Sequence, residues 1–405
     1  MKKSELTVIG AGASGIMAAL TAAMQGKKVT LIERQARVGR KLMATGNGRC
    51  NITNIKADLP FYHGDNVGFA EYALCSMPVQ KTIEFFSSIG LLTTVEEGGR
   101  VYPLSNSANS VVDTLRYALE ATGVEIVNSC LIKTAKKHGD VFRIYSDEPV
   151  IECNKLIIAC GGAAGEKLGG SQDGYKILKS FGHSSTAIAP ALSQIKTKPD
   201  FPRSLKGVKA DVRARIEENG NTIATSEGEA LFTETGVSGP AIFDISRTAA
   251  VNSNKNLELR LNFFRNRTEA DLYDYINNKK QKMPNLSASE VWTGALHNRL
   301  GRMLIKYSGI DSNKIVSELS QDEMSKIVRN SLDFVLPIYG TDSFSQAQVT
   351  AGGIRCSEFC DKTMQSKIVK GLYACGEVLD IDGDCGGFNL QWAWSSGYLA
   401  GLTLD

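Results

Sequence analysis

The sequence predicts an α/β fold, α+β overall, and three observations along its 405 residues carry this prediction. An apolar run over residues 6–9 ends in the glycine turn of residues 10–15, and a helical pattern follows at once. Strands that end in glycines return late in the chain, at 348–354 and 371–380. Between the two ends, from about residue 191 to 344, strand-like alternation gives way to helical patterns. The two ends are therefore expected to form one domain, interrupted by an insertion.

The N-terminal strand, turn and helix predict a Rossmann-like three-layer domain that binds the ADP part of a dinucleotide. Gly10 permits the sharp turn, Gly12 lets a pyrophosphate approach the backbone, and Gly15 lets the helix pack close to the strand. Ala13 and Ser14 complete the turn and start the helix. The anion is expected at the helix N-terminus.

Glu33 directly follows the second apolar strand, residues 28–32. An acid in this place accepts hydrogen bonds from ribose hydroxyls and would repel a 2′-phosphate. FAD and NAD both satisfy this condition. The alternative is a glycine turn in an unrelated α/β domain, which is disfavoured because strand, turn, helix, strand and acid all occur in register.

A basic, glycine-containing loop follows over residues 34–54. Such a loop can wrap a pyrophosphate and the polar edge of a cofactor. The alternative is a solvated basic loop, but residues 46–48, Gly-Asn-Gly, are costly to order unless something packs on them. The candidate cofactor-binding residues here are Arg34, Arg40, Lys41, Gly46, Asn47 and Arg49.

The next segment is expected to complete the first part of this domain. Helical patterns cover 79–89 and 111–121, and short strands are expected at 124–127, from 132 onward, at 141–145 and at 150–153. Residues 155–162 have the pattern of a separate, buried parallel strand that ends in glycines. This strand would return the chain to the sheet beside the nucleotide, at Gly161.

The insertion is expected to be an antiparallel sheet or small barrel followed by helices. Residues 205–264 alternate as strands do, and 268–332 contain three helical patterns, the clearest at 289–308. A loop at 232–240 opens a further helix, which Thr235 or Ser238 could cap. The expected domains are a cofactor domain at 1–190 and 345–405, a β domain at 191–267 and 333–344, and a helical subdomain at 268–332.

A second glycine-opened helix N-terminus, before the apolar helix 391–402, favours FAD over NAD. It can face a second part of one long cofactor, and a flavin has ribityl hydroxyls and an N1/O2 locus that becomes negative on reduction. Glu377 could bond the ribityl chain, and the amides around Asn389 and Leu390 could meet N1/O2. Gly386 and Gly387 belong to the same turn.

The chain resembles, from end to end, the bacterial aminoacetone-oxidase-like flavoproteins, a family of NAD(P)/FAD-dependent oxidoreductases with the glutathione-reductase type of FAD domain. The resemblance rests on the segments 10–15, 39–54, 98–105, 232–240, 349–354 and 371–397, of which 39–54 and Gln-Trp-Ala-Trp-Ser-Ser-Gly at 391–397 are the most specific. It implies ADP-binding positions at Gly10, Gly12, Gly15 and Glu33, a loop over the cofactor at Arg40, Lys41, Asn47 and Arg49, and flavin-end positions at Glu377, Gly387, Asn389 and Leu390. It also implies that the adenine lies against the backbone near Ile132.

These observations predict an FAD-dependent oxidoreductase that transfers a hydride at flavin N5 to or from a small organic substrate. Two types remain open: a reductase fed by NAD(P)H, and an amine oxidase that uses oxygen. The middle of the chain has no second GxGxxG, so any NAD(P)H would dock transiently. Catalytic side chains are not assigned; Arg49, Tyr102, Glu234 and Asn389 are candidates for substrate contact.

Two other classes of function compete with this one. A flavin-dependent RNA-modifying or RNA-binding protein would need a basic and aromatic groove, and a flavin sensor without turnover would hold FAD that no donor reduces. The net charge of +3 and the pI near 8.3 are too mild to indicate nucleic acid or an anionic membrane. We therefore expect a small-molecule substrate, no nucleic-acid partner and no membrane, with the oligomeric state open.

The cysteines indicate the redox compartment. There are nine, with no Cys-x-x-Cys pair, in a chain too long to need disulfides. We read them as reduced thiols of a cytoplasmic protein. The four histidines are scattered, so no metal site is expected.

Overall fold

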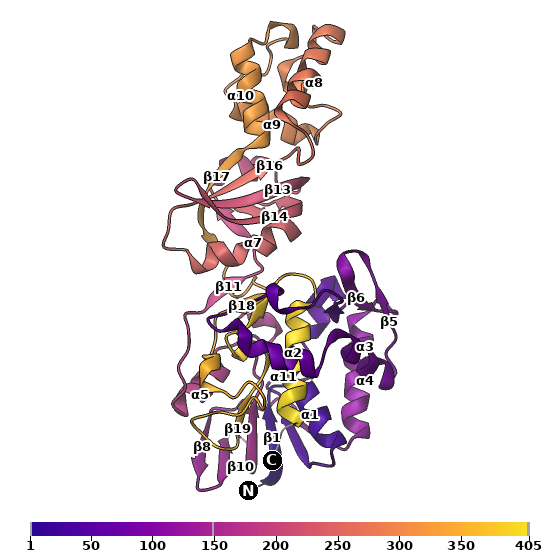
Figure 1. Ribbon diagram of the computed structural model, residues 1–405, viewed down its shortest axis with the longest axis vertical. Coiled ribbons are helices and arrows are strands. Elements are labelled where there is room, and N and C mark those ends of the chain that lie inside the picture. Colours follow the sequence, from indigo (N-terminus) through magenta and orange to yellow (C-terminus); the bar gives the residue numbers. More distant parts are fainter. Residues whose placement is uncertain (1, 148–149, 403–405) are drawn as a thin grey trace. The chain divides into compact units, whose positions relative to one another are not determined.

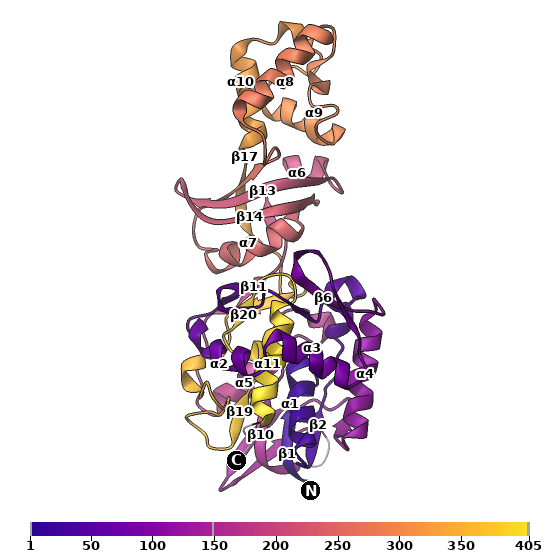
Figure 2. The same cartoon turned by 45° about the vertical axis from the view of Figure 1, so that its right-hand side comes forward.

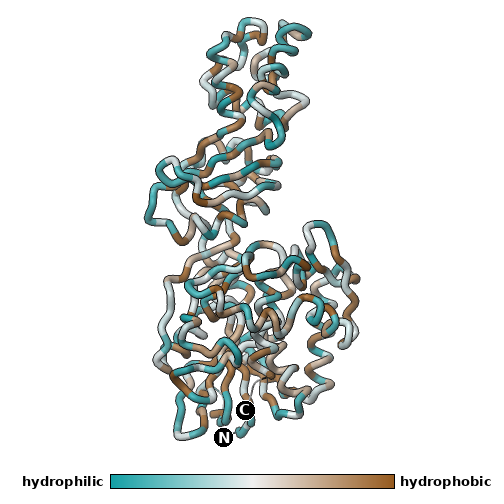
Figure 3. Tube along the Cα trace, in the orientation of Figure 1, coloured by the Kyte–Doolittle hydropathy of each residue, from teal (hydrophilic) through white to brown (hydrophobic). Residues whose placement is uncertain are grey.

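The computed structural model describes residues 2–147 and 150–402 and forms two compact units (Figure 1). The first, here called the terminal unit, contains Met1–Ala189 and Phe344–Asp405, and the second, the inserted unit, contains Pro190–Ser343. Each unit has its own buried hydrophobic core. In Figure 3 hydrophobic residues concentrate inside each unit, and the outer loops are mostly hydrophilic.

The terminal unit is built on a seven-stranded sheet with the order β7-β2-β1-β10-β9-β8, to which β19 adds beside β10. Its strands are β1 (Lys2–Ile9), β2 (Val29–Ile32), β7 (Glu125–Val127), β8 (Thr134–His138), β9 (Val141–Tyr145), β10 (Ile151–Ile158) and β19 (Leu372–Ala374). Strand β10 forks, because its first half pairs antiparallel with β9 and its second half pairs parallel with β19. The fork joins the parallel core of the sheet to an antiparallel meander.

Helices and small sheets complete this unit. The helices are α1 (Ala13–Met24), α2 (Ala70–Ser76), α3 (Val79–Ser88), α4 (Ala108–Ala121), α5 (Asp173–Ser180) and α11 (Phe388–Leu402). The remaining strands are β3 (Thr53–Asn54), β5 (Thr93–Val95) and β6 (Arg100–Pro103) in one sheet, and β4 (Tyr62–His63) and β20 (Asp382–Gly383) in another. A further pair is β18 (Val349–Ala351) and β11 (Ala189–Ala191), which begins at the last residue of this unit's first segment.

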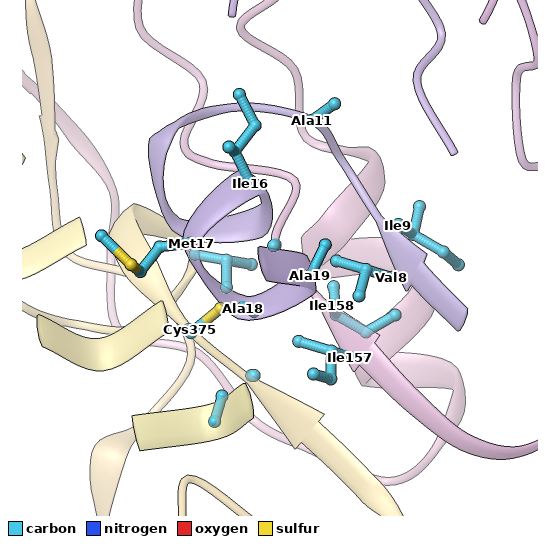
Figure 4. Close-up of a cluster of buried hydrophobic side chains, with 14 of the residues drawn as sticks. Val8, Ile9, Ala11, Ile16, Met17, Ala18, Ala19, Ile157, Ile158 and Cys375 are labelled. Carbon is cyan, nitrogen blue, oxygen red and sulfur yellow. The ribbon is translucent and has the colours of Figure 1, made fainter. Parts of the chain in front are cut away.

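The centre of the terminal unit is tightly packed, which fixes the first turn. Figure 4 shows Val8 of β1 and Ile157 and Ile158 of β10 around the small side chains Ala18 and Ala19 of α1. All five are fully buried. Alanines on this helix let it lie close to the strands, so the turn between β1 and α1 has little freedom.

The inserted unit is a closed barrel with the strand order β12-β15-β14-β13-β16-β17, together with five helices in the described chain. The strands are β12 (Ile195–Thr197), β13 (Lys209–Glu218), β14 (Asn221–Phe232), β15 (Gly236–Ser238), β16 (Leu257–Asn262) and β17 (Phe334–Thr341). The helices are α6 (Asp200–Ser204), α7 (Pro240–Val251), α8 (Glu269–Lys282), α9 (Asn298–Tyr307) and α10 (Gln321–Leu332). The helices of residues 269–332 share one hydrophobic core with the barrel. The predicted fold class, with its inserted barrel and helices, is confirmed.

Three local predictions were wrong. The two strands predicted at 150–153 and 155–162 are one strand, β10 (Ile151–Ile158), because β1 runs from Lys2 and pairs along its whole length. The helix predicted at 289–308 begins only at Asn298, since Trp292 packs beneath α9 against Gly301.

The third concerns the start of α7. Neither Thr235 nor Ser238 caps this helix: Gly239, with φ of +104°, occupies the N-cap, and residues 236–238 are strand β15 of the barrel. A Cβ at Gly239 would lie 2.6 Å from the carbonyl oxygen of Glu229, so the turn excludes a capping side chain there.

Two searches of the described ranges complete the picture. No helix in residues 2–147 or 150–402 is long and apolar enough to cross a bilayer. Over the same residues, no three His, Cys, Asp or Glu side chains are grouped as metal ligands.

Candidate functional site

The carboxyl ends of four parallel strands meet at one edge of the terminal unit's sheet. Strands β1, β2, β10 and β19 pair parallel to one another, so the segments that follow them lie side by side. Those segments contain the glycine turn, Glu33, Gly161 and Glu377. In open α/β sheets this edge is the place where ligands bind.

The three glycines of the first turn differ in what surrounds them. A Cβ at Gly10 would lie 2.4 Å from the carbonyl oxygen of Ala159, and one at Gly15 would lie 1.8 Å from that of Gly10. A Cβ at Gly12 would meet no atom of the described residues within 4 Å. Gly12 is also the N-cap of α1, and no side chain of the described chain caps that end. Gly10 and Gly15 are therefore required by packing, whereas Gly12 opens onto space at a positive helix end that suits an anion.

Ser14 faces the sheet and not this open space. Its side chain is buried, and its Oγ donates a 3.4 Å hydrogen bond to the carbonyl oxygen of Cys375. A Cβ at Gly376 would lie 2.3 Å from the same Oγ. Ser14 thus holds the segment after β19 against the start of α1, which places Glu377 beside the glycine turn.

Glu33 is held by two backbone amides. One carboxylate oxygen accepts from Ala11 N–H at 2.8 Å and the other from Gln35 N–H at 2.8 Å. The side chain is partly exposed, and each carboxylate oxygen can accept more than one hydrogen bond. The carboxylate is therefore pre-oriented and keeps acceptor capacity for a pair of ribose hydroxyls.

The segment before Ile132 lies next to Glu33. Cys130 N–H donates to the carbonyl oxygen of Glu33 at 2.9 Å, and Ser129 N–H donates to that of Gln35 at 3.0 Å. Ile132 itself is 6% exposed. If Glu33 binds the ribose of a nucleoside, the base of that nucleoside would lie against this segment.

Helices α1 and α11 pack in parallel along a line of glycines, and they lie side by side in Figures 1 and 2. A Cβ at Gly397 would lie 2.3 Å from the carbonyl oxygen of Ser14, and one at Gly401 would lie 2.4 Å from that of Ala18. Both pairs advance in the same direction, so the two N-termini face the same way. Because α11 begins at Phe388, its N-terminus lies about 12 Å beyond that of α1 at 1.5 Å per residue. One elongated ligand can therefore meet both positive helix ends.

The start of α11 contains an unsatisfied polar group. A Cβ at Gly387 would lie 2.5 Å from the carbonyl oxygen of Thr53 and 3.1 Å from Oδ1 of Asn51. This Oδ1 is buried, and within the described ranges it has no hydrogen-bond partner. A buried amide without a partner costs free energy, so this place suits a ligand with polar edges.

The side chain of Asn389 bonds to the turn before α11, while the expected contact of the amides around Asn389 and Leu390 with a flavin stays a prediction. The Asn389 side chain accepts from Gly383 N–H at 2.8 Å and donates to the carbonyl oxygens of Gly383 at 2.7 Å and Asp384 at 3.2 Å. These bonds hold the turn before α11. The partly buried Leu390 and the glycine pair, Gly386 (φ +128°) and Gly387 (φ +106°), form the helix start itself.

Glu377 directly follows Gly376, which packs against Ser14 at the start of α1, and it is paired with Lys41. Lys41 Nζ is 2.8 Å from one carboxylate oxygen, and Thr350 N–H donates to the other at 2.8 Å. A Cβ at Gly162 would lie 2.7 Å from this carboxylate, and one at Gly161 would lie 4.0 Å away. The glycines after β10 therefore leave room for Glu377, and Lys41 compensates its charge.

Arg34 and Arg40 of this loop have hydrogen-bond partners within the protein. Arg34 donates to Asp173 at 3.2 Å and to the carbonyl oxygen of Gly170 at 3.1 Å, and Arg40 donates to Gln35 at 3.3 Å. Asn47 is exposed and, like Gly46, adopts a left-handed conformation.

Arg49 is bound to the neighbouring hairpin. It pairs with Glu96 and Asn106 and lies over the ring of Tyr102, 3.9 Å from the centroid. The hydrogen bond to Glu96 raises the pKa of Arg49. Arg49 and Tyr102 thus lie together, in an arrangement that fixes the loop on β6.

Glu234 belongs to the inserted unit and is not grouped with these residues. It is exposed and pairs with Lys206 at 3.0 Å, and this hydrogen bond lowers its pKa.

Asn51, Thr350 and the glycines of α11 were missed by the sequence reasoning. Asn51 stands in the loop that was singled out, but its type alone does not show that it is buried and unsatisfied. A signal did exist for Gly397 and Gly401, because small residues four apart lie on one face of a helix and allow close approach of another.

The fold and the site together define a flavoprotein oxidoreductase of the FAD-dependent class, as predicted. The model of the HI0933-like protein Rossmann domain matches residues 4–403, and the chain belongs to this family.

Relatives match over nearly the full chain. The chain is 36% identical over 402 residues to a 3-dehydro-bile acid delta(4,6)-reductase of Clostridium scindens, with 98% of each chain covered. It is 30% identical over 425 residues to a ribosomal RNA dihydrouridine synthase of Haemophilus influenzae, with 99% of this chain and 98% of the relative covered. Among solved structures, a 3-ketosteroid delta1-dehydrogenase from Sterolibacterium denitrificans has the same fold, with a TM-score of 0.52, 11% identity and 99% of each chain covered.

Proposed function

We propose that the protein is an FAD-dependent reductase that saturates a carbon–carbon double bond conjugated with a carbonyl group in a small organic molecule. The observation that carries the cofactor part is the parallel pair of helix N-termini, about 12 Å apart along one direction. When bound, FAD supplies a two-electron carrier that exchanges a hydride at N5.

The residues present fit four parts of this cofactor: the pyrophosphate, the ribose, the ribityl chain and the flavin ring. The open space over Gly12 suits the pyrophosphate, and Glu33 suits the ribose of the ADP part. Glu377, oriented by Thr350 and Lys41, suits the ribityl hydroxyls. Asn51 would find its missing hydrogen-bond partner in the flavin ring at the start of α11. The positive helix end there favours the negative charge that a flavin develops on reduction.

The relatives favour a reductase over an amine oxidase. One is named a delta(4,6)-reductase of a 3-dehydro bile acid, and the other a dihydrouridine synthase. Both names describe the addition of hydrogen to a double bond in a ring that also carries a carbonyl group. This shared chemistry, and not either substrate, is what we propose for this chain.

A nicotinamide dinucleotide is the proposed electron source. The sequence contains no second glycine fingerprint, so the donor would have to leave before the substrate enters. The test is to add NADH or NADPH anaerobically to the purified holoprotein and follow the visible flavin band. We expect NADH or NADPH to bleach the flavin band and amines to leave it unchanged. Bleaching by an amine alone would show that the protein is an amine oxidase and not a reductase.

A second candidate substrate is uridine in ribosomal RNA. The 30% identity to the Haemophilus influenzae relative over almost the whole chain favours it. The mild charge of the chain does not. Incubating the reduced protein with unmodified ribosomal RNA and measuring dihydrouridine by mass spectrometry decides between the two.

A further inference from the structure

A histidine–carboxylate pair lies at the end of the site where the flavin is expected. His63 is the last residue of β4, and it pairs in register with Asp382 of β20. Strand β20 leads through Asp384 directly into the turn at Gly386 and Gly387 and into α11. His63 therefore lies beside the segment that starts the helix.

The pair has the geometry of an oriented imidazole. His63 Nε2 is 2.7 Å from Oδ1 of Asp384, and the two side chains are 36% and 32% exposed. Asp384 is itself fixed, because its N–H donates to the carbonyl oxygen of Phe61 at 3.0 Å and its own carbonyl accepts from Asn389 at 3.2 Å. One ring nitrogen is thus held, and the other, Nδ1, is left for another partner.

Strand β4 is also attached to the first turn of α11. The rings of Phe61 and Phe388 stack with centroids 4.6 Å apart, and the hydroxyl of Tyr62 donates to the carbonyl oxygen of Phe388 at 3.1 Å. With His63 bonded to Asp384, the three consecutive residues 61–63 all contact the start of α11 or the turn before it. The imidazole consequently has a fixed position relative to the helix end that would meet N1/O2 of the flavin.

The charged groups around His63 leave it as the residue suited to proton transfer. Asp65 pairs with Arg355 at 2.8 Å, and Asp380 accepts from Asp65 N–H at 3.1 Å. Asp382, its partner in the register, is buried. Among these side chains the imidazole is the type that most often serves as a general acid in enzymes.

The other candidates are less suitable. His183 is buried and bonded at both ring nitrogens, to Glu358 at 2.8 Å and to Ser366 at 2.9 Å. The ring of Tyr102 is covered by the guanidinium of Arg49.

We propose that His63 is the proton donor of the reduction and that Asp384 positions it. This inference rests on the proposed function. A hydride added to the β-carbon of the conjugated substrate leaves an electron pair on the α-carbon and the carbonyl oxygen. A proton from Nδ1 of the imidazolium then forms the α-carbon–hydrogen bond, so the substrate gains two hydrogens. The neutral imidazole recovers its proton from water, to which it is partly exposed.

Reduction of the flavin by NADH and its reoxidation by the substrate can be measured separately, and only the second step needs a proton donor to carbon. In His63→Gln, bleaching of the flavin by NADH should keep the wild-type rate, because that step needs no proton donor to carbon. Anaerobic reoxidation by a conjugated ketone should slow by about a hundredfold or more, the usual contribution of a general acid. His138→Gln, an exposed histidine on β8, is the matched control and should leave both rates unchanged.

A structural role for the pair predicts different results. In His63→Ala, added imidazole should restore reoxidation at a rate that rises with the imidazole concentration; a residue that only holds the hairpin would show no such rescue. Reoxidation of His63→Gln within threefold of wild type would overturn the role of His63 alone. A wild-type protein that no conjugated ketone reoxidises would overturn the proposed function, and the role of His63 with it.

Discussion

At the scale of single residues, similar side chains in one motif have different physical roles. Gly10 and Gly15 avoid backbone clashes, whereas Gly12 borders open space. The sequence predicted these three roles because they follow from the backbone geometry of the turn. It could not predict that Arg34 and Arg49 are bonded to Asp173 and Glu96, because those partners are remote in the chain.

The open space over Gly12 gives a prediction for Gly12→Ala. Its φ of −80° suits alanine and the Cβ meets no described atom, so the thermal stability of the FAD-free protein should change little. The added methyl group would occupy the expected pyrophosphate position, and the affinity for FAD should fall at least about tenfold, a loss of about 1.4 kcal/mol. Gly68→Ala, another glycine with room for a Cβ, is the control for titration with FAD. Unchanged FAD affinity in Gly12→Ala would contradict binding of the pyrophosphate at Gly12.

At the scale of secondary-structure elements, the parallel contact of α1 and α11 creates the site. The sequence predicted both helices and both glycine-opened N-termini. It did not predict their register, because contacts between the first and last helices depend on the whole sheet between them. The glycines at 397 and 401 bring the two backbones into contact, and the resulting offset sets the distance between the helix ends.

Gly397→Ala tests this contact. The new Cβ would lie 2.3 Å from the carbonyl oxygen of Ser14, a backbone atom that cannot move alone. Overpacking of this kind costs about 1–3 kcal/mol, so the free energy of unfolding and the FAD affinity should both fall. Leu402→Ala, at the exposed end of α11, should change neither by more than about 0.5 kcal/mol. Equal denaturation midpoints for the two variants would show that the helices are not in close contact.

The hydrogen bonds of His183 with Glu358 and Ser366 predict that the stability of the protein depends on pH. Burial lowers the pKa of His183 despite the carboxylate of Glu358, so the folded protein holds this imidazole neutral. In the unfolded chain this imidazole binds a proton below about pH 6.5, whereas in the folded chain it stays neutral to lower pH. The free energy of unfolding should therefore fall as the pH drops below about 6.5. Burial raises the pKa of Glu358, but hydrogen bonds from Ser184 and His183 outweigh it and lower the pKa overall. A second loss is therefore expected below about pH 4.5.

Urea denaturation between pH 5 and 8 measures the first of these effects. His183→Gln should have a free energy of unfolding lower by roughly 1–3 kcal/mol at every pH, because Glu358 and Ser366 lose a hydrogen-bond partner. Its free energy of unfolding should also depend less on pH below about 6.5. His138→Gln should keep the wild-type slope. A slope that is the same in all three proteins would show that His183 is free to take a proton in the folded state.

At the scale of the whole molecule, the chain consists of two units with separate cores, and the residues that fit FAD all belong to the terminal unit. The change of pattern near residue 191 predicted an insertion. The extent of β10 and the start of α9 were not predicted, because both depend on packing partners: β1 lengthens the strand, and the buried Trp292 occupies the place of a helical turn.

Separate cores predict two thermal transitions. In scanning calorimetry, FAD at a hundred times its dissociation constant should stabilise the terminal unit by about 2.7 kcal/mol and raise one transition only. Hydrogen exchange should show the added protection in β1, α1 and the start of α11. A single transition that shifts as a whole when FAD is added would show that the units unfold together.

The central claim, reduction of a conjugated double bond, is tested most directly by the anaerobic reoxidation of the reduced holoprotein. The protein is reduced with one equivalent of NADH or dithionite and mixed with a cyclic conjugated ketone, and in parallel with the same ketone lacking the double bond. The account predicts that only the conjugated ketone restores the oxidised flavin spectrum, and that mass spectrometry finds a product with two additional hydrogens. A flavin that remains reduced with every conjugated carbonyl compound, and reoxidises only with oxygen, would contradict it.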